Sequence, residues 1–78
     1  MPQQTEAEIW LGEAARNLLA AAGFSVPTNH RNAWRLFVAL GDELFERECL
    51  SVAAVREMTA EQRDALKESV LDRLAAHR

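Results

Sequence analysis

The most apolar stretch of the chain runs from Thr28 to Cys49, and its pattern predicts one long helix. At about 100° per residue its apolar side chains spread over roughly 220° of the circumference, whereas a surface helix needs a stripe little wider than 100°. These residues are Ala33, Trp34, Leu36, Phe37, Val38, Leu40, Gly41, Leu44, Phe45 and Cys49. The strip expected to face solvent holds Arg35, Ala39, Asp42, Glu43 and Glu46. We therefore expect the rest of the chain to cover this helix on two or three sides.

Gly41 lies in the middle of this central helix, where it has no capping role. Glycine in a helix interior is less favourable than alanine by up to about 1 kcal/mol, so another contribution is expected to compensate. We expect another helix to cross closely at Gly41, and the alanine-rich side of the first helix is one candidate.

A first helix is expected over residues 5–22, after a frayed polar leader over residues 1–4. Thr5 and Glu8 have the T-x-x-E spacing of a capping box, in which each side chain bonds a free backbone N–H. Gly23 ends the helix because glycine readily takes the positive φ of the residue after a helix C-cap. The apolar positions step by four and three along one seam: Ala7, Leu11, Ala14, Leu18 and Ala21.

The breaks between the later helices are marked by proline and by capping residues. Pro27 cannot lie inside a helix, so a loop separates the first helix from the central one. Thr28 or Asn29 is expected to cap the central helix, over residues 28–49, and Ser51 to cap a short helix over residues 52–57. The central helix is expected to fade near Cys49 and Leu50.

A last helix is expected over residues 59–77, where Thr59 and Gln62 form a second capping box. Its apolar seam consists of Leu66, Val70 and Leu74, with Leu71 at the edge. Its outer face carries an acidic ridge of Glu61, Asp64, Glu68 and Asp72. A single helix over residues 51–77 is the alternative, but the two caps favour a bend.

The sequence contains no strand pattern and no internal repeat, so we predict an all-α fold. The expected architecture is one domain over residues 1–78, a small bundle of three main helices and one short connecting helix. Alanine accounts for 14 of the 78 residues, so the core is thin. Small chains with thin cores often gain stability by oligomerising, and a homodimer is the expected assembly. A marginally stable monomer is the alternative.

The residues that would carry catalysis or metal binding are missing from the sequence pattern. Cys49 is the one cysteine, which excludes an intramolecular disulfide and a multi-cysteine zinc site. We expect it to be a buried, inert thiol. His30 lies about 28 Å from it along one helix, too far for a catalytic pair. Neither histidine follows a glutamate by three positions, and there is no glycine-rich phosphate loop. We predict no enzymatic activity, no metal and no cofactor.

Charge and hydropathy narrow the expected partners and location. The nine basic and twelve acidic residues give a net charge of −3 and are interspersed, unlike the basic footprint of a nucleic-acid-binding protein. No signal-peptide pattern and no apolar run long enough for a membrane span are present, so a cytoplasmic location without membrane contact is expected. The alanine-, arginine- and leucine-rich composition is typical of a GC-rich bacterial or phage genome.

One segment has the outline of a helix-turn-helix motif, namely residues 50–63. The second helix of that motif presents its N-terminal residues to base edges. Here that position offers Glu61 and Asp64 beside Gln62 and Arg63, and carboxylates repel phosphates. A small DNA-binding regulator is therefore kept as the alternative function, with nucleic acid the less favoured partner.

Apolar residues at the edges of the helices favour a protein partner. Trp10 lies at the edge of the apolar arc of the first helix, and tryptophan and arginine are common in interface hot spots. The alternative for Trp10 is that it covers the core. We predict a non-enzymatic protein–protein interaction module, a small regulator, inhibitor or accessory subunit that docks an apolar helix surface on a partner protein. Its candidate anchors are Ile9, Trp10, Leu36 and Leu40, with a polar rim of His30, Arg31 and Arg35.

Overall fold

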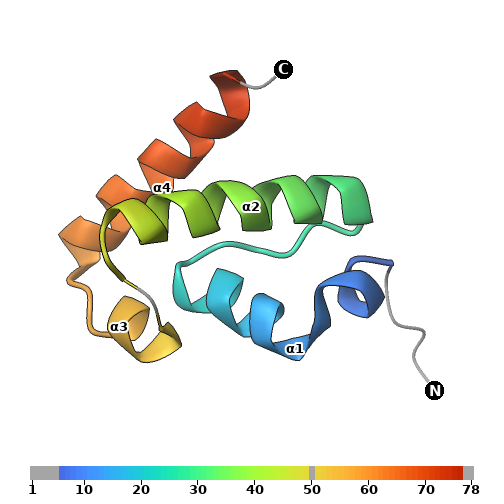
Figure 1. Cartoon of the computed structure of the whole chain (residues 1–78), viewed down its shortest axis with the longest axis horizontal. Helices are drawn as coiled ribbons and strands as arrows, with labels where there is room; N and C mark the ends of the chain where they lie inside the picture. The colour runs from blue at the N-terminus through green and yellow to red at the C-terminus, as the bar shows by residue number, and fades with distance from the viewer. Residues whose placement is uncertain (1–5, 50, 77–78) are drawn as a thin grey trace.

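The chain is all-α, as the sequence pattern predicts. The computed structural model describes the backbone of residues 6–49 and 51–76, and the side chains of these ranges from residue 12 onward, with residue 50 left out. Within these ranges there are four helices and no strand (Figure 1). They are α1 (Glu6–Ala21), α2 (His30–Glu46), α3 (Val52–Arg56) and α4 (Ala60–Ala76). The expected leader over residues 1–4 and the capping box of Thr5 and Glu8 lie outside the described residues and side chains.

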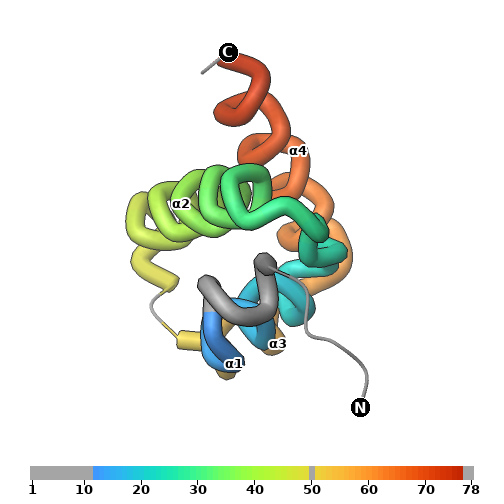
Figure 2. Tube along the Cα trace, turned by 90° about the vertical axis from the view of Figure 1, so that its right-hand side faces the viewer, coloured from blue at the N-terminus to red at the C-terminus, as the bar shows by residue number. Residues whose placement is uncertain are grey.

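Helix α2 lies between α1 and α4 in the packing of the bundle. It contacts both helices, and α1 also contacts α3. Helices α1 and α2 run in the same direction, because the linker of residues 22–29 returns along their length before α2 begins (Figure 1). Seen along α2, helix α4 lies on one side and α1 on another, and the remaining side faces outward (Figure 2). Two neighbours therefore cover the central helix.

The core forms where these helices meet. Leu19 of α1, Leu40 of α2 and Leu66 of α4 are the largest fully buried side chains. The full buried cluster consists of Leu19, Ala22, Leu36, Ala39, Leu40, Leu44, Val55, Leu66 and Val70. Burial of such side chains is the main favourable term in folding, and this cluster draws on all four helices.

The N-terminal caps expected for the later helices are confirmed. Asn29 caps α2 by accepting hydrogen bonds from the N–H groups of Arg31 and Asn32. Ser51 caps α3 through a 3.1 Å bond from the Ala54 N–H. At α4 the capping box is reciprocal. The Gln62 N–H donates to Thr59 Oγ1 at 3.1 Å, and the Thr59 N–H donates to Gln62 Oε1 at 3.0 Å. Residues 51–76 are thus two helices and not one.

Helices α1 and α2 end in the same hydrogen-bonding motif. Gly23 has a φ of 87°, and the N–H of Phe24 donates to the Leu19 carbonyl at 2.9 Å. This is the Schellman arrangement, and it confirms the stop expected at Gly23. Helix α2 ends at Glu46, earlier than expected, because Glu48 adopts the left-handed conformation with a φ of 57°. The Cys49 N–H then bonds the Leu44 carbonyl at 2.9 Å.

The buried side of α2 differs from the one expected. Ala39 and Glu43, assigned above to the solvent-facing strip, are buried, whereas Trp34, Val38 and Phe45 are exposed. The buried residues of α2 span about 140° at 100° per residue. They are Ala33, Leu36, Ala39, Leu40, Glu43 and Leu44. The expected apolar arc was wider than two neighbouring helices can cover, and the position of α4 decides which part is buried.

Helix α1 is interrupted at Gly12, where the expectation was an unbroken helix. Gly12 has non-helical angles, with a φ of 70° and a ψ of 172°, a conformation that glycine reaches without steric cost. The regular rotation of 100° per residue is lost at such a break. The apolar positions before Gly12 therefore do not predict which face of α1 is buried after it. The buried residues that follow are Ala15, Leu19 and Ala22. The predicted seam positions lie one residue earlier: Ala14 is exposed, and Leu18 and Ala21 are half-buried.

The orientation of α2 can be tested by replacing valine with alanine at a buried position, Val70, and at an exposed position, Val38. We expect Val70→Ala, at a fully buried position, to lower the free energy of unfolding by about 1.5–3 kcal/mol through lost burial and a residual cavity. We expect Val38→Ala, on the exposed side of α2, to change it by less than about 0.5 kcal/mol. Urea unfolding in dilute solution, followed by circular dichroism, measures both. Equal losses at the two sites would contradict the orientation described here.

Candidate interaction surface

Four residues form a continuous line along the outward side of α2: Trp34, Val38, Gly41 and Phe45, called here the outer seam. Their spacing of four, three and four places them within about 60° of one another on the helix. Trp34 is 54% exposed, Val38 43% and Phe45 74%. An apolar row at this spacing has the period of a helix that packs against another helix. Here no helix within the described chain covers the row.

The outer seam is bordered by a groove next to α1 and by a hollow next to α4. The groove has a volume of about 370 Å³ and is lined by Phe37, Gly41 and Phe45 together with Ala14 and Leu18 of α1, among others. The ring of Phe37 also lies beside that of Trp34, with centroids 5.9 Å apart. The hollow, of about 330 Å³, is lined by Trp34, Arg35, Val38, Ala39, Asp42, Arg73 and Leu74. The seam is therefore the centre of a wider apolar surface.

Gly41 belongs to this surface and does not mark a close crossing within the chain. A Cβ added at Gly41 would meet no atom within 4 Å. The expectation that another helix of this chain, such as α1, approaches it closely is therefore wrong. Nothing within the described chain requires a glycine at this position of α2.

Charged residues at the two ends of the outer seam have opposite sign. Arg31 and Arg35 are exposed near the start of α2, next to the half-buried His30. Asp42 and Glu46 are exposed toward the other end, with side chains 59% and 61% accessible. The outward side of α2 thus changes from basic to acidic along its length.

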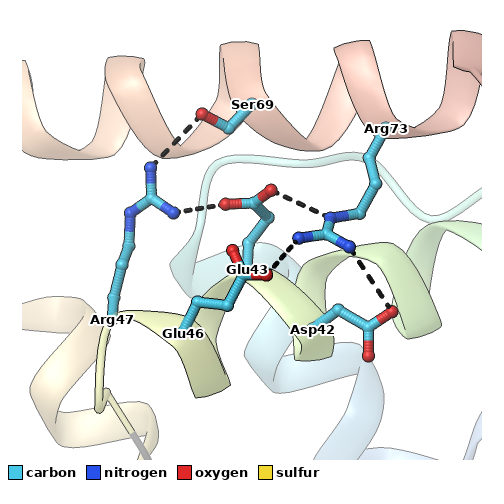
Figure 3. Close-up of polar contacts among 6 residues, drawn as sticks. All are labelled: Asp42, Glu43, Glu46, Arg47, Ser69 and Arg73. Carbon is cyan, nitrogen blue, oxygen red and sulfur yellow. Dashed lines mark hydrogen bonds and ion pairs between the residues drawn. The ribbon is translucent and has the colours of Figure 1, made fainter.

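A polar cluster between α2 and α4 fixes the orientation of the seam (Figure 3). Its centre is Glu43, which is only 7% exposed. Arg73 of α4 donates from Nε to Glu43 Oε1 at 2.9 Å and also bonds Glu46 at 2.8 Å. Arg47 pairs with the second oxygen of Glu43, and it donates to the Ser69 hydroxyl of α4 at 3.3 Å. These contacts hold Glu43 toward α4, and therefore the seam away from it.

This cluster corrects one expectation from the sequence. Glu43, Glu46 and Arg47 have the pattern of an ordinary charged helix surface, yet Glu43 is buried. A carboxylate is seldom buried unless it is paired, and here both of its oxygens accept hydrogen bonds from arginines. Arg73, which supplies one of them, is 30 residues away in the sequence, and helical periodicity gives no sign of that contact.

The pairing shifts the pKa of both partners. Burial raises the pKa of Glu43, but the hydrogen bonds and positive charges of Arg73 and Arg47 outweigh burial and leave that pKa below the ordinary 4.5. The hydrogen bonds from Arg73 to Glu43 and Glu46 raise the pKa of Arg73 above its ordinary value. Glu43 and Arg73 are thus an ion pair under neutral conditions.

The anchors predicted from the sequence are redistributed by the fold. Leu36 and Leu40 lie in the core, 7% and 0% exposed, which corrects their assignment to a partner-binding surface. They lie on the side of α2 that α1 and α4 cover. Ile9 and Trp10 belong to α1, but their side chains lie outside the described part of the structure.

The predicted polar rim, by contrast, lies beside the outer seam. His30, Arg31 and Arg35 occupy the first turns of α2 and line a hollow together with Trp34. Sequence reasoning missed Trp34, Val38 and Phe45 as surface residues because it counted them among the covered ones. Their four-three-four spacing is the signal that could have separated them from the core side of the helix.

Within the described residues, no three side chains of histidine, cysteine, aspartate or glutamate are grouped closely enough to hold a metal ion. Cys49 is a half-buried thiol packed against the core. None of the described helices combines the length and the apolar character needed to cross a membrane.

The residues of the helix-turn-helix outline form α3, a turn and the start of α4. Arg63 turns its guanidinium back to the Met58 carbonyl, at 3.1 Å. Glu61, Asp64 and Glu68 are exposed on α4. The side of α4 available to a partner is therefore acidic, and the DNA-binding alternative stays a prediction without a described feature that favours it.

Comparison with known proteins gives no match to a family model, to a curated protein or to a solved structure.

The lowered pKa of Glu43 predicts a pH-dependent stability. A carboxyl group with a lowered pKa in the folded state stabilises the fold fully above its unfolded-state pKa, and this contribution is lost as the pH falls through the folded-state pKa. We expect Glu43→Gln to lower the free energy of unfolding by about 1–3 kcal/mol near pH 7. We also expect the variant to lose less stability than the parent chain between about pH 6 and pH 3. Urea unfolding across this range measures both effects.

Glu68→Gln, at an exposed position of α4, is the matched control. It should follow the parent chain at each pH. If Glu43→Gln also followed the parent chain, the ion pair with Arg73 would not contribute to stability.

Proposed function

We propose that this chain is a non-enzymatic protein–protein interaction module, a small regulator, inhibitor or accessory subunit, and that it binds its partner through the outer seam of α2. The observation that carries the proposal is the exposure of Trp34, Val38 and Phe45 in one row on the central helix. No metal or cofactor takes part, and the setting is the cytoplasm.

The physical reason is the composition of the row. Aromatic side chains dominate binding energy at interfaces because each removes a large apolar area from water with few rotatable bonds. Two of the four seam residues are aromatic, and Phe37 adjoins them. Exposed apolar residues scattered singly need no explanation, whereas a contiguous apolar patch with polar neighbours is typical of a binding surface.

The mode of action is steric. The cluster around Glu43 and the buried core hold α2 in place, so the outer seam is presented on a rigid element without folding on binding. A partner that packs along α2 covers the apolar row, and the charged residues at its ends set the orientation. The bound chain then blocks or bridges whatever surface of the partner it covers.

Photocrosslinking in the cells from which the sequence originates tests this proposal. The photoreactive analogue benzoylphenylalanine is placed at Phe45, and in a second chain at Leu71. Leu71 is the matched control, because it is an apolar residue of α4 that is 51% exposed. We expect a covalent protein adduct at position 45, at least about tenfold more abundant than at position 71, since only the seam residue is in an interface.

A further variant separates binding from chance contact. Trp34→Glu, about three helical turns away on the same seam, should remove the adduct at position 45 because it places a charge in the apolar row. Circular dichroism should show that the variant remains helical. The absence of any adduct at position 45 in the otherwise unchanged chain would overturn the proposal, as would an adduct that Trp34→Glu leaves intact.

A further inference from the structure

We infer that the protein that covers the outer seam is a second copy of this chain, packed through α2 about a two-fold axis with the two helices antiparallel. This rests on the proposed function and names the partner. Two observations carry it: the charges beside the seam are complementary to themselves in this orientation, and Gly41 provides a close-approach site that the chain itself does not use.

The spacing of the seam fits a two-fold contact. Positions 34, 38, 41 and 45 alternate as the two core positions of a heptad repeat. When two such helices pack antiparallel and are centred between positions 38 and 41, Trp34 of one copy lies opposite Phe45 of the other. Val38 then lies opposite Gly41. Two-fold symmetry makes each of these pairs occur twice, so both copies use the same patch.

The flanking charges select the antiparallel orientation. In this register Arg35 of each copy lies beside Asp42 of the other, and Arg31 approaches the acidic C-terminal end of α2. A parallel pairing would place the flank of Arg35 and Asp42 in one copy and the same flank of the other copy at opposite edges of the contact, so these charges would not meet. The opposite charges are brought together only in the antiparallel pairing, and the distribution of charge along α2 therefore favours that orientation.

Gly41 has a role in this arrangement. A helix-interior glycine lowers helix stability relative to alanine, and the space around Gly41 is open within the chain. Opposite Val38 of the second copy, the missing side chain lets the two backbones approach. The seam thereby has its two smaller residues, Val38 and Gly41, at the centre of the contact and its aromatic residues, Trp34 and Phe45, at the ends.

The size of the contact sets the expected affinity. From position 34 to position 45 the seam extends about 17 Å at 1.5 Å per residue. This is short compared with the helices of a permanent dimer, even with Phe37 and the bordering groove included. We expect dimerisation in the micromolar range, where mass depends on protein concentration.

Light scattering on a sizing column tests the inference, with the protein at about 1–300 µM. The parent chain is compared with two variants that reverse one charge each. The parent chain should approach twice the monomer mass as concentration rises. Arg35→Asp and Asp42→Arg should each weaken the dimer at least about tenfold, because each places like charges together at two symmetric sites. An equimolar mixture of the two variants should dimerise again, because every contact then pairs opposite charges.

The control is Asp72→Arg, which makes the same charge change on the exposed face of α4, away from the seam. It should leave the mass of the dimer unchanged. Circular dichroism of each variant shows whether it folds, and recovery in the mixture excludes a folding defect as the cause of the loss. The ion pair of Asp42 with Arg73 spans 4.0 Å and is exposed, so its loss contributes little.

A monomer at every concentration would overturn this inference, and so would a dimer that neither charge reversal weakens. A mixture that stays monomeric would overturn the antiparallel pairing. These results are distinct from failure of the proposed function. If the chain were monomeric but photocrosslinked to a different protein at position 45, the interaction module would stand and the second copy would not be its partner.

Discussion

Helix α2 has more apolar surface than its two neighbours can cover, and the docking of α4 decides which part is left outside. Leu66 and Val70 of α4 join Leu36, Ala39 and Leu40 of α2 in the core. Since α1 occupies another side of the same helix (Figure 2), the outer seam stays in contact with water. Burial of apolar area drives this packing. The exposed row is what remains once it is complete.

The ion pairs of Glu43 determine which side of α2 faces α4. Apolar contacts alone allow a helix to rotate by a fraction of a turn at small cost, because their energy depends little on direction. A buried carboxylate bonded to two arginines does not allow this, since rotation would leave a largely buried charge without its partners. Arg73 also reaches Glu46 and Asp42, so the contact extends to the rim of the outer seam. The same interaction thus orders the bundle and orients the surface.

The proposed function and its partner follow from features that the core does not use. A bundle of this size gains little from three large apolar side chains left in water, and association is the ordinary way to cover them. Gly41 at the centre of α2 has open space around it within the described chain, and in the proposed dimer it lies opposite Val38 of the second copy. The basic-to-acidic gradient along α2 supports the same antiparallel pairing.

Local features were readable in the sequence because they depend on near neighbours. The four helices, the caps at Asn29, Ser51 and Thr59, the stop at Gly23 and the seam of α4 each follow from a few adjacent residues. The face that each of the first two helices buries was not readable. The break at Gly12 removes the phase of α1, and an apolar arc of roughly 220° on α2 is compatible with several orientations. Leu36 and Leu40, predicted as partner anchors, and Glu43, predicted to face solvent, are therefore buried. Trp34, Val38 and Phe45, predicted to be covered, are exposed. Only the tertiary structure decided this, because the deciding contacts join residues about 30 positions apart, and helical periodicity records only the residues of one helix.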